Sequence, residues 1–245
     1  MTTSLVSPRC IRSRRNARGD ASGGTTATPI LDWASPEIVT MSPVDPDLIN
    51  AREFLIEVHA HIARTIRPVY AMDDRQPASV TVRRGRGSCS QRLAVLEAVA
   101  RRAGIVTRVR GIAVDGSFWY PRFPRLKWLV PDRVILAWPE FMVDGHWTQV
   151  GELYGSIEEM SACGLGFTNA DGETLFDAIA RTAIDWDGRS GIESCDLSAV
   201  VKEDLGYFDS RDDLFGARGQ TLAWLPRCLA DQAMGRRSAS AALRL

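Results

Sequence analysis

The apolar positions of the chain first follow the period of a helix. Between Asp45 and about Thr65, apolar residues recur at helical spacing and predict one buried face, made of Leu48, Leu55, Val58 and Ile62. Asp45 is a favourable capping residue, and Pro46 suits the first turn that follows it. The pattern therefore predicts a long helix over residues 45–65.

A second helical pattern begins after two glycines. Gly85 and Gly87 let the backbone approach closely, and Ser88 is a good helix cap. A glycine stop follows Ala103, and the buried face before it is predicted to consist of Leu93, Leu96, Val99 and Ala100. The sequence thus predicts a helix from the Ser88 cap to about Ala103, with Cys89 in its first turn.

After this helix the pattern changes to that of strands. Alternating or continuous apolar runs predict strands at residues 105–114, 117–123, 134–143 and 146–150. A short approach strand is expected before the glycines, at 80–82. Asp115-Gly116 and Asp144-Gly145 are strong turn signals. Further helices are expected at 157–162, 173–184, 197–205 and, interrupted by a proline, 221–234. The predicted fold class is α+β: a helix bearing Cys89 at its N-terminus packed on an antiparallel sheet, with additional N- and C-terminal helices.

Length and composition add bounds to this picture. The 245 residues suffice for one large core and have the composition of an ordinary globular protein. We expect a single domain over 29–235, between a disordered arginine-rich tail at 1–28 and a frayed tail at 236–245. The formal net charge is zero, no apolar run reaches the length of a membrane span, and no export signal follows the start. We therefore expect a cytoplasmic protein that binds neither nucleic acid nor a membrane.

The cysteines narrow the chemistry. All five are scattered and none forms a CxxC pair, which favours reduced thiols over a disulfide framework. The three histidines are not spaced from them as zinc ligands would be, so we expect no metal and no cofactor. Cys89 differs because a helix start offers its thiolate free N–H groups and the positive end of the dipole. We interpret Cys89 as a nucleophile; the alternative is a buried structural cysteine.

A nucleophilic thiol needs a base or an orienting partner. The strand after the helix returns toward Cys89, which places Asp115 and Asp132 at the correct end of the sheet; the alternatives are a turn residue and a polar loop residue. His59 is the candidate imidazole if its helix covers the site, with a satisfied histidine at the helix edge as the alternative. His146 is expected roughly 26 Å away, at ~3.3 Å per strand residue, as a solvated turn residue.

Candidates for substrate binding surround these positions. Ser88 is a polar neighbour of the thiol. Trp119 and Tyr120, in an aromatic-rich arm, are expected to wall a pocket. Arg122 and Arg133 are candidates to hold a carboxamide, an enolate or a phosphate, with solvated surface arginines as the alternative.

The order and spacing of several motifs over about residues 70–151 resemble the transglutaminase-like superfamily. The motifs are Gly-x-Gly-x-Cys, a helix, Arg-x-Ala-Gly-Ile, Arg-x-Arg-Gly, Ala-Trp-x-Glu, Asp-Gly and Trp. The resemblance implies a papain-like core with Cys89 as nucleophile. This sequence departs from the family where the catalytic histidine should precede Ala-Trp, because Leu136 stands there. The family's third catalytic residue aligns with about Gly151. We therefore expect Leu136 to contact the substrate and not to act as a catalytic residue.

Two longer motifs resemble a smaller group within that superfamily. Gly-Ser-Cys-Ser and Asp-Gly-x-Phe-Trp-Tyr-Pro-Arg-Phe resemble the Dieckmann cyclases that close tetramic acid and pyridone rings in polyketide–nonribosomal peptide antibiotic pathways. The resemblance implies that Cys89 takes an acyl group from a β-ketoacyl-aminoacyl thioester on an acyl or peptidyl carrier protein. An enolate made by Asp115 or His59 would then close the ring. Two alternatives stay open: a cysteine amidase, peptidase or amide synthase of the same fold, and a non-catalytic binding protein with a degenerate triad.

Overall fold

The fold is built on a small antiparallel sheet. The computed structural model describes residues 21–125, 127–162, 167, 169, 172–186, 197–221 and 237–239. Its four-stranded sheet has the order β5-β4-β3-β6 and consists of β3 (Thr107–Asp115), β4 (Arg133–Val143), β5 (His146–Gln149) and β6 (Val201–Phe208). All three strand pairs are antiparallel. A separate parallel pair joins β1 (Arg67–Pro68) to β2 (Arg86–Gly87).

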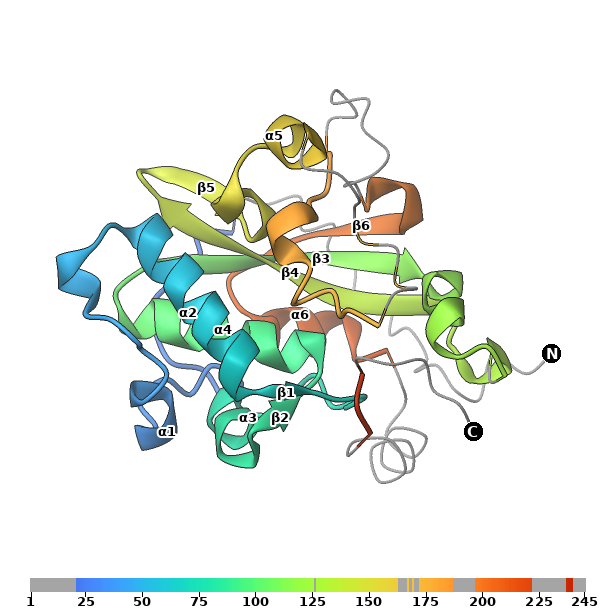
Figure 1. Cartoon of the computed structure of the whole chain (residues 1–245), viewed down its shortest axis with the longest axis horizontal. Helices are drawn as coiled ribbons and strands as arrows, with labels where there is room; N and C mark the ends of the chain where they lie inside the picture. Colours follow the sequence, from blue (N-terminus) through green and yellow to red (C-terminus); the bar gives the residue numbers. More distant parts are fainter. Residues whose placement is uncertain are drawn as a thin grey trace.

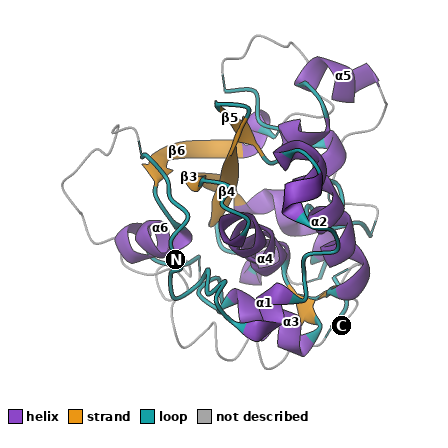
Figure 2. Cartoon of the chain, turned by 90° about the vertical axis from the view of Figure 1, so that its left-hand side faces the viewer, coloured by secondary structure: helices purple, strands orange, loops and turns teal. Residues whose placement is uncertain are grey.

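Helices gather around one helix beside this sheet. The α-helices are α1 (Pro36–Val39), α2 (Ala51–Thr65), α3 (Ala78–Arg84), α4 (Cys89–Arg102), α5 (Ile157–Ala162) and α6 (Arg211–Arg218). Short 3-10 turns are η2 (Pro46–Leu48), η3 (Gly116–Arg122), η4 (Lys127–Leu129), η5 (Gly151–Tyr154), η6 (Ile179–Arg181) and η7 (Ser198–Val200). Figure 1 shows α2 beside α4 below the sheet, and Figure 2 shows α4 between α2 and α6. Helices packed against an antiparallel sheet confirm the predicted α+β class.

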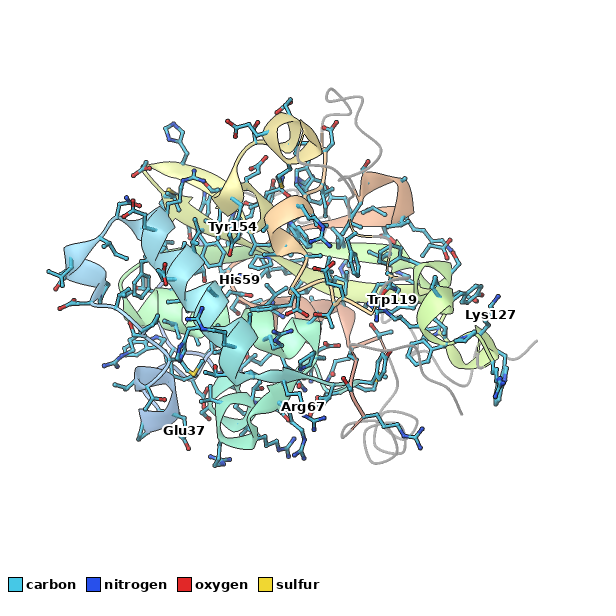
Figure 3. All side chains as sticks on the ribbon, viewed as in Figure 1. Glu37, His59, Arg67, Trp119, Lys127 and Tyr154 are labelled. Carbon is cyan, nitrogen blue, oxygen red and sulfur yellow. The ribbon has the colours of Figure 1, made fainter. Side chains whose placement is uncertain are left out.

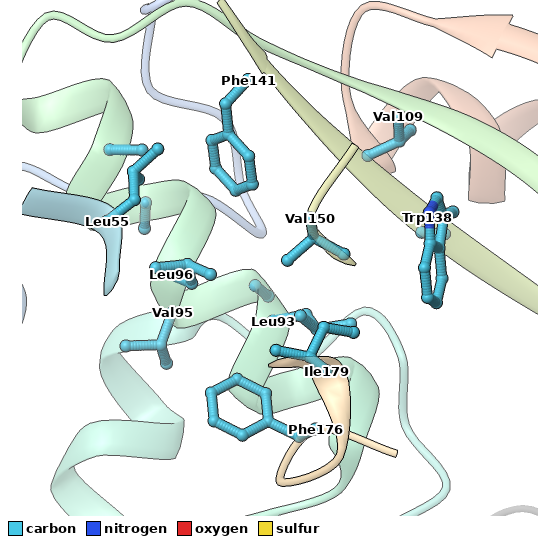
Figure 4. Packing of buried hydrophobic residues seen from close by; sticks show 14 of the residues in the cluster. Leu55, Leu93, Val95, Leu96, Val109, Trp138, Phe141, Val150, Phe176 and Ile179 are labelled. Atoms are coloured by element: carbon cyan, nitrogen blue, oxygen red, sulfur yellow. The ribbon is translucent and has the colours of Figure 1, made fainter. Parts of the chain in front are cut away.

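The core is centred on α4. Every residue from Gln91 to Arg101 is buried, so the helix is enclosed on all sides rather than along the one predicted face. Its apolar side chains, among them Leu93 and Leu96, pack in one cluster with Phe141 of the sheet (Figure 4). Because residues 91–101 of α4 are all buried, their polar side chains must find partners inside the protein. This enclosure fixes the end of α4 that carries Cys89.

Several local predictions are confirmed. The helix capped by Ser88, the strands at 105–114 and 134–143, and the helix at 157–162 all appear, within a few residues of the expected bounds. The Asp144-Gly145 turn has φ values of 52° and 78°, the left-handed conformation that a tight hairpin between β4 and β5 requires.

The predictions of strands at residues 80–82 and 117–123 are wrong. Residues 80–82 lie inside α3, which ends at Gly85 with φ 57°. Residues 117–123 form the 3-10 turn η3 instead of a second hairpin arm, because the Asp115 carboxylate accepts the N–H of Ser117 and caps the turn. The next strand along the chain that pairs with β3 is β4, with Asp115 opposite Arg133.

The later helices also differ from the prediction. The segment 197–205 enters β6 and pairs with β3, and 173–184 contains only the short turn η6. The predicted helix at 45–65 is split, since Asn50 caps a new helix at Ala51. Leu48 consequently lies in η2 and is 80% exposed instead of buried. Most of the predicted segment 221–234 lies outside the described residues.

Both predicted tails are partly packed. Gly24 forms a β-bridge with Thr107, so the packed chain begins before residue 29. At the other end, Ser238 forms a β-bridge with Val69, and the N–H of Ala239 donates to the carbonyl of Pro68 over 3.1 Å. This second contact brings residues 237–239 to the segment beside Cys89.

Candidate functional site

Cys89 is the first residue of α4, and its free thiol is partly exposed. The Ser88 hydroxyl accepts the N–H of Gln91 over 3.3 Å, and the Gln91 side chain accepts the N–H of Ser88 over 3.1 Å. This reciprocal cap leaves the N–H groups of Cys89 and Ser90 for another acceptor. The positive end of the helix therefore lies at the sulfur, where it favours a thiolate. Ser88 serves as the cap; a contact with substrate stays a prediction.

Close packing holds the turn that carries the thiol. A Cβ on Gly87 would lie 2.7 Å from Cγ2 of Thr81 and 3.2 Å from Cβ of Gln91, so glycine is needed here. The Gln91 amide also donates to the carbonyl of Asp73 over 2.9 Å. Gln91 thus fixes the capping box to the loop that precedes α3.

A buried arginine ties the same turn to the sheet. Arg211 donates to the hydroxyl of Ser90 over 3.0 Å and to the carbonyl of Ala137 over 3.4 Å. Its Nε forms an ion pair with Glu97 over 2.6 Å, with neither side chain exposed. This network holds the start of α4 against β4 at the residue directly after Leu136.

Tyr70 is an ionisable neighbour of the thiol, and Arg122 lies on the Tyr70 side chain. The N–H of Val69 donates to the carbonyl of Gly87 over 3.0 Å, which brings the following Tyr70 alongside the start of α4. Burial raises the pKa of Tyr70, and a negative charge on Cys89 raises it further, whereas the guanidinium of Arg122 lowers it. The Tyr70 hydroxyl therefore lies within electrostatic range of both the sulfur and the guanidinium.

Arg122 is buried, which excludes the solvated surface arginine considered from the sequence. Its side chain is only 3% exposed. Nε donates to Oδ1 of Asn169 over 2.7 Å, and Nη1 donates to the carbonyl of Ala239 over 3.0 Å. Nη2 is buried and has no hydrogen-bond partner within the described structure. Arg133, in contrast, forms a surface ion pair with Glu203 over 2.7 Å.

Aromatic rings pack around Tyr70 and next to Arg122. The rings of Tyr70 and Phe123 lie 5.1 Å apart, and Trp119 packs against the same cluster while contacting Phe118 edge-on at 5.1 Å. Tyr120 lies 5.6 Å from the ammonium of Lys127. The structure thus brings Trp119 to the neighbourhood of Tyr70, as an aromatic wall requires, while Tyr120 packs with the adjacent loop.

His59 is engaged away from the thiol. It is buried, with Nε2 2.8 Å from the carbonyl of Phe176 and Nδ1 2.6 Å from the hydroxyl of Tyr154. Burial lowers its pKa. These bonds match a neutral ring that donates from Nε2 and accepts at Nδ1. Figure 3 shows His59 beside Tyr154 and well separated from Trp119. The environment of His59 is thus that of a histidine whose two ring nitrogens both have hydrogen-bond partners, which is the alternative considered from the sequence.

Asp115 lies at the predicted end of the sheet. A carboxylate must be desolvated to become a stronger base, and Asp115 is not desolvated. Its carboxylate caps η3 and forms an ion pair with Lys202 over 2.9 Å, with 35% of the side chain exposed. The hydrogen bonds from Lys202 and Ser117 lower its pKa to about 2. Asp115 is therefore not desolvated as expected, and a role as the base stays a prediction.

The contacts of the other predicted residues, Asp132, Leu136 and His146, are with neighbouring parts of the fold. Asp132 is exposed, and its backbone carbonyl accepts the N–H of Gly116 over 3.0 Å. Leu136 is half-buried on β4 opposite Ile112. His146 is exposed at the far hairpin, with Nδ1 2.9 Å from the carbonyl of Asp144, as predicted. Contacts of Asp132 and Leu136 with substrate stay predictions.

Sequence reasoning missed Tyr70, Asn169 and Ala239. Tyr70 falls in a segment predicted as a loop, and the two-residue pairing of β1 with β2 that positions it has no periodic signal. Asn169 and Ala239 reach Arg122 from distant parts of the chain. No local motif marks these three residues; only the tertiary fold brings them together.

Two other kinds of site are absent from the described residues. Over the described residues, no three His, Cys, Asp or Glu side chains gather as a metal ion would require. In the same part of the chain, none of the helices has the length and apolar character needed to traverse a bilayer.

Comparison with known proteins relates the part of the chain around Cys89 to one family. No curated protein and no solved structure matches the chain. A family model does match, over residues 40–151, and this range holds α2, α4 and the β3–β4–β5 meander. Its description is the transglutaminase-like superfamily, which includes cysteine-dependent acyltransferases and peptidases. Residues 40–151, with Cys89 at the start of the central helix, thus match the model of this superfamily.

Proposed function

We propose that the protein is a cysteine-dependent Dieckmann cyclase that forms a tetramic acid or a related ring. The observation that carries the proposal is the environment of Cys89: a partly exposed thiol at a helix start, with buried Tyr70 beside it, Arg122 next to Tyr70, and His59 bonded elsewhere. The two sequence motifs that resemble such cyclases lie in this environment, around Cys89 and over η3.

The first step is acyl transfer to the enzyme. The Cys89 thiolate adds to the carbonyl of a β-ketoacyl-aminoacyl thioester held by a carrier protein. The free N–H groups at the start of α4 stabilise the oxyanion. The C–S bond of the thioester then breaks and expels the phosphopantetheine thiolate. A thiolate leaves without the acid assistance that a leaving amine needs, so a dedicated histidine is dispensable here.

The second step makes the enolate. The methylene between the ketone and the amide carbonyl is acidic, and the expelled thiolate takes one of its protons. This transfer replaces the base predicted at Asp115, whose lowered pKa makes it a weak proton acceptor. The products of the step are a neutral thiol and an enolate on the acyl-enzyme.

Ring closure completes the turnover. The enolate carbon attacks the acyl-Cys89 carbonyl, a C–C bond forms, the C–S bond to Cys89 breaks, and the thiolate is restored. The cluster of Tyr70, Phe118, Trp119 and Phe123 supports this step, because an apolar surrounding disfavours attack by water on the acyl-enzyme. The net reaction converts one thioester into one ring and one thiol.

The partner implied by this scheme is an acyl or peptidyl carrier protein. A small thioester with the same β-ketoacyl-aminoacyl group tests the chemistry without it. The wild-type enzyme is expected to release the ring product, and Cys89→Ala is expected to release none while unfolding at the wild-type temperature. Release of the linear acid in place of the ring would instead favour a hydrolase of the same fold, and an inert wild type would favour a binding protein.

A further inference from the structure

We infer that Tyr70 and Arg122 form a preformed anion site beside Cys89 that holds the enolate oxygen of a 1,3-dicarbonyl substrate. This inference rests on the proposed function and names the chemical group that the site selects. It assigns a role to Tyr70, for which the sequence offers no motif.

Arg122 has no carboxylate among its hydrogen-bond partners in the described structure. Three other buried arginines pair with a carboxylate: Arg92 with Asp177 and Arg108 with Glu140, both over 2.7 Å, and Arg211 with Glu97 over 2.6 Å. Buried Arg101 is held by neutral oxygens, but each of its three guanidinium nitrogens donates a hydrogen bond. The described partners of Arg122 are neutral oxygens, and its Nη2 is left without one. A buried cation without a counter-ion is costly, which indicates that an anionic ligand completes the site.

The guanidinium of Arg122 is held rigidly. Nε and Nη1 are fixed by Asn169 and Ala239, and Asn169 also donates to the carbonyl of Phe118 over 2.7 Å. Ala239 in turn donates to Pro68 on β1. The unpartnered Nη2 thus belongs to a side chain anchored on two sides, an arrangement suited to a fixed ligand position.

Tyr70 lies between the start of α4 and the Arg122 segment. The residue directly follows Val69, whose N–H binds Gly87, two positions before Cys89. Its ring packs 5.1 Å from Phe123, the residue after Arg122. Because burial raises the pKa of Tyr70, the hydroxyl stays protonated at neutral pH and serves as a hydrogen-bond donor.

In this proposal the two negative charges of the reaction bind at two different places. The acyl oxyanion lies at the start of α4, while the enolate oxygen accepts hydrogen bonds from Tyr70 and from Nη2 of Arg122. The site therefore favours substrates whose acidic carbon lies between two carbonyls, since only these give a stable enolate. A simple acyl thioester has no such group and uses only the helix start.

The test separates acylation from ring closure. Tyr70→Phe is expected to slow ring closure by about 10²-fold, the loss typical of one oxyanion donor. Acylation of Cys89 by a simple acyl thioester should stay close to the wild-type rate, so the acyl-enzyme accumulates. Arg122→Lys, which keeps the charge but loses the planar fork, should show the same split. Tyr207→Phe removes another hydroxyl that contacts an arginine, at 3.1 Å from Arg110, and serves as the matched control.

Direct binding supplies a second readout. The parent tetramic acid, an acidic 1,3-dicarbonyl, is expected to bind the wild-type enzyme in calorimetry, and its affinity should fall at least tenfold in Tyr70→Phe. The uncharged lactam of the same ring size should bind neither protein. Equal ring closure and equal anion binding by Tyr70→Phe and the wild type would overturn the inference while leaving the proposed function intact. A wild type that binds the anion at Tyr70 but closes no ring would overturn the proposed function alone.

Discussion

Nη1 of Arg122 donates a hydrogen bond to the carbonyl of Ala239, 3.0 Å away and 117 positions later in the sequence. Through this bond a segment near the C-terminus fixes the orientation of a buried cation beside the nucleophile. The same residue, Ala239, is hydrogen-bonded to Pro68 on β1, the strand that leads to Tyr70. The C-terminal segment is therefore part of the site.

Removing residues 237–245 is expected to impair ring closure more than acylation of Cys89. The deletion leaves Nη1 of Arg122 and the carbonyl of Pro68 without their partners. Rates of both steps, measured by mass spectrometry of the enzyme and of the product, test this. The control is deletion of residues 241–245, which keeps Ala239. Equal loss in both truncations, or none in the longer one, would contradict the expected role of Ala239.

Gly87→Ala should lower both stability and the rate of Cys89 acylation. The new Cβ would lie 2.7 Å from Thr81 and would press on Gln91, which completes the helix cap. Overpacking of this kind costs about 1–3 kcal/mol in the free energy of unfolding. Gly216→Ala is the matched control, because its Cβ meets no atom within 4 Å and the change adds a better helix former to α6. Denaturant unfolding that ranks Gly87→Ala equal to Gly216→Ala would refute the close-packing account.

His59 should make stability depend on pH below neutrality. Burial lowers its pKa from the usual 6.5, so the unfolded chain binds a proton more readily than the folded protein. The contribution is present above pH 6.5 and is lost as the pH falls from 6.5 through the lowered folded-state pKa. His59→Phe should flatten this part of the stability profile, whereas a change at the exposed His146 should not. A wild-type profile with no slope over this range would show that His59 is not buried as a neutral ring.

Asp115→Asn should leave ring closure close to the wild-type rate. Asp115 is held ionised by Lys202 and Ser117, which lower its pKa to about 2, and in the proposed scheme the expelled thiolate takes the proton. Loss of a general base would slow the reaction by about 10²-fold or more. A loss of that size in Asp115→Asn, with acylation of Cys89 unchanged, would return the role of base to this carboxylate.

The elements that could be predicted from the sequence are those determined by neighbouring residues. The capped start of α4 at Ser88, the helix that carries Cys89 and the Asp144-Gly145 hairpin each depend on neighbouring residues, and each is found. The α+β class follows from the same elements. The lack of a histidine at Leu136 is likewise a property of the sequence alone.

The failures occur where tertiary contacts override a short apolar run. Residues 201–205 have a pattern that suits either a helix or a strand, and pairing with β3 makes them a strand. Residues 117–122 turn instead of extending, because Asp115 caps them and Gly116 packs where a Cβ would meet the carbonyl of Pro131. The pairing of Tyr70 with Arg122 needs residues 169 and 237–239, which no local pattern connects to Cys89.

The central claim is that Cys89 carries the acyl group from which the ring closes. Time-resolved intact mass of the wild-type enzyme with a β-ketoacyl-aminoacyl thioester measures this directly. The account predicts an adduct equal to the substrate minus its thiol, located on the peptide that contains Cys89, which disappears at the rate at which the ring product forms. Ring formation at an unchanged rate in Cys89→Ala would contradict the account.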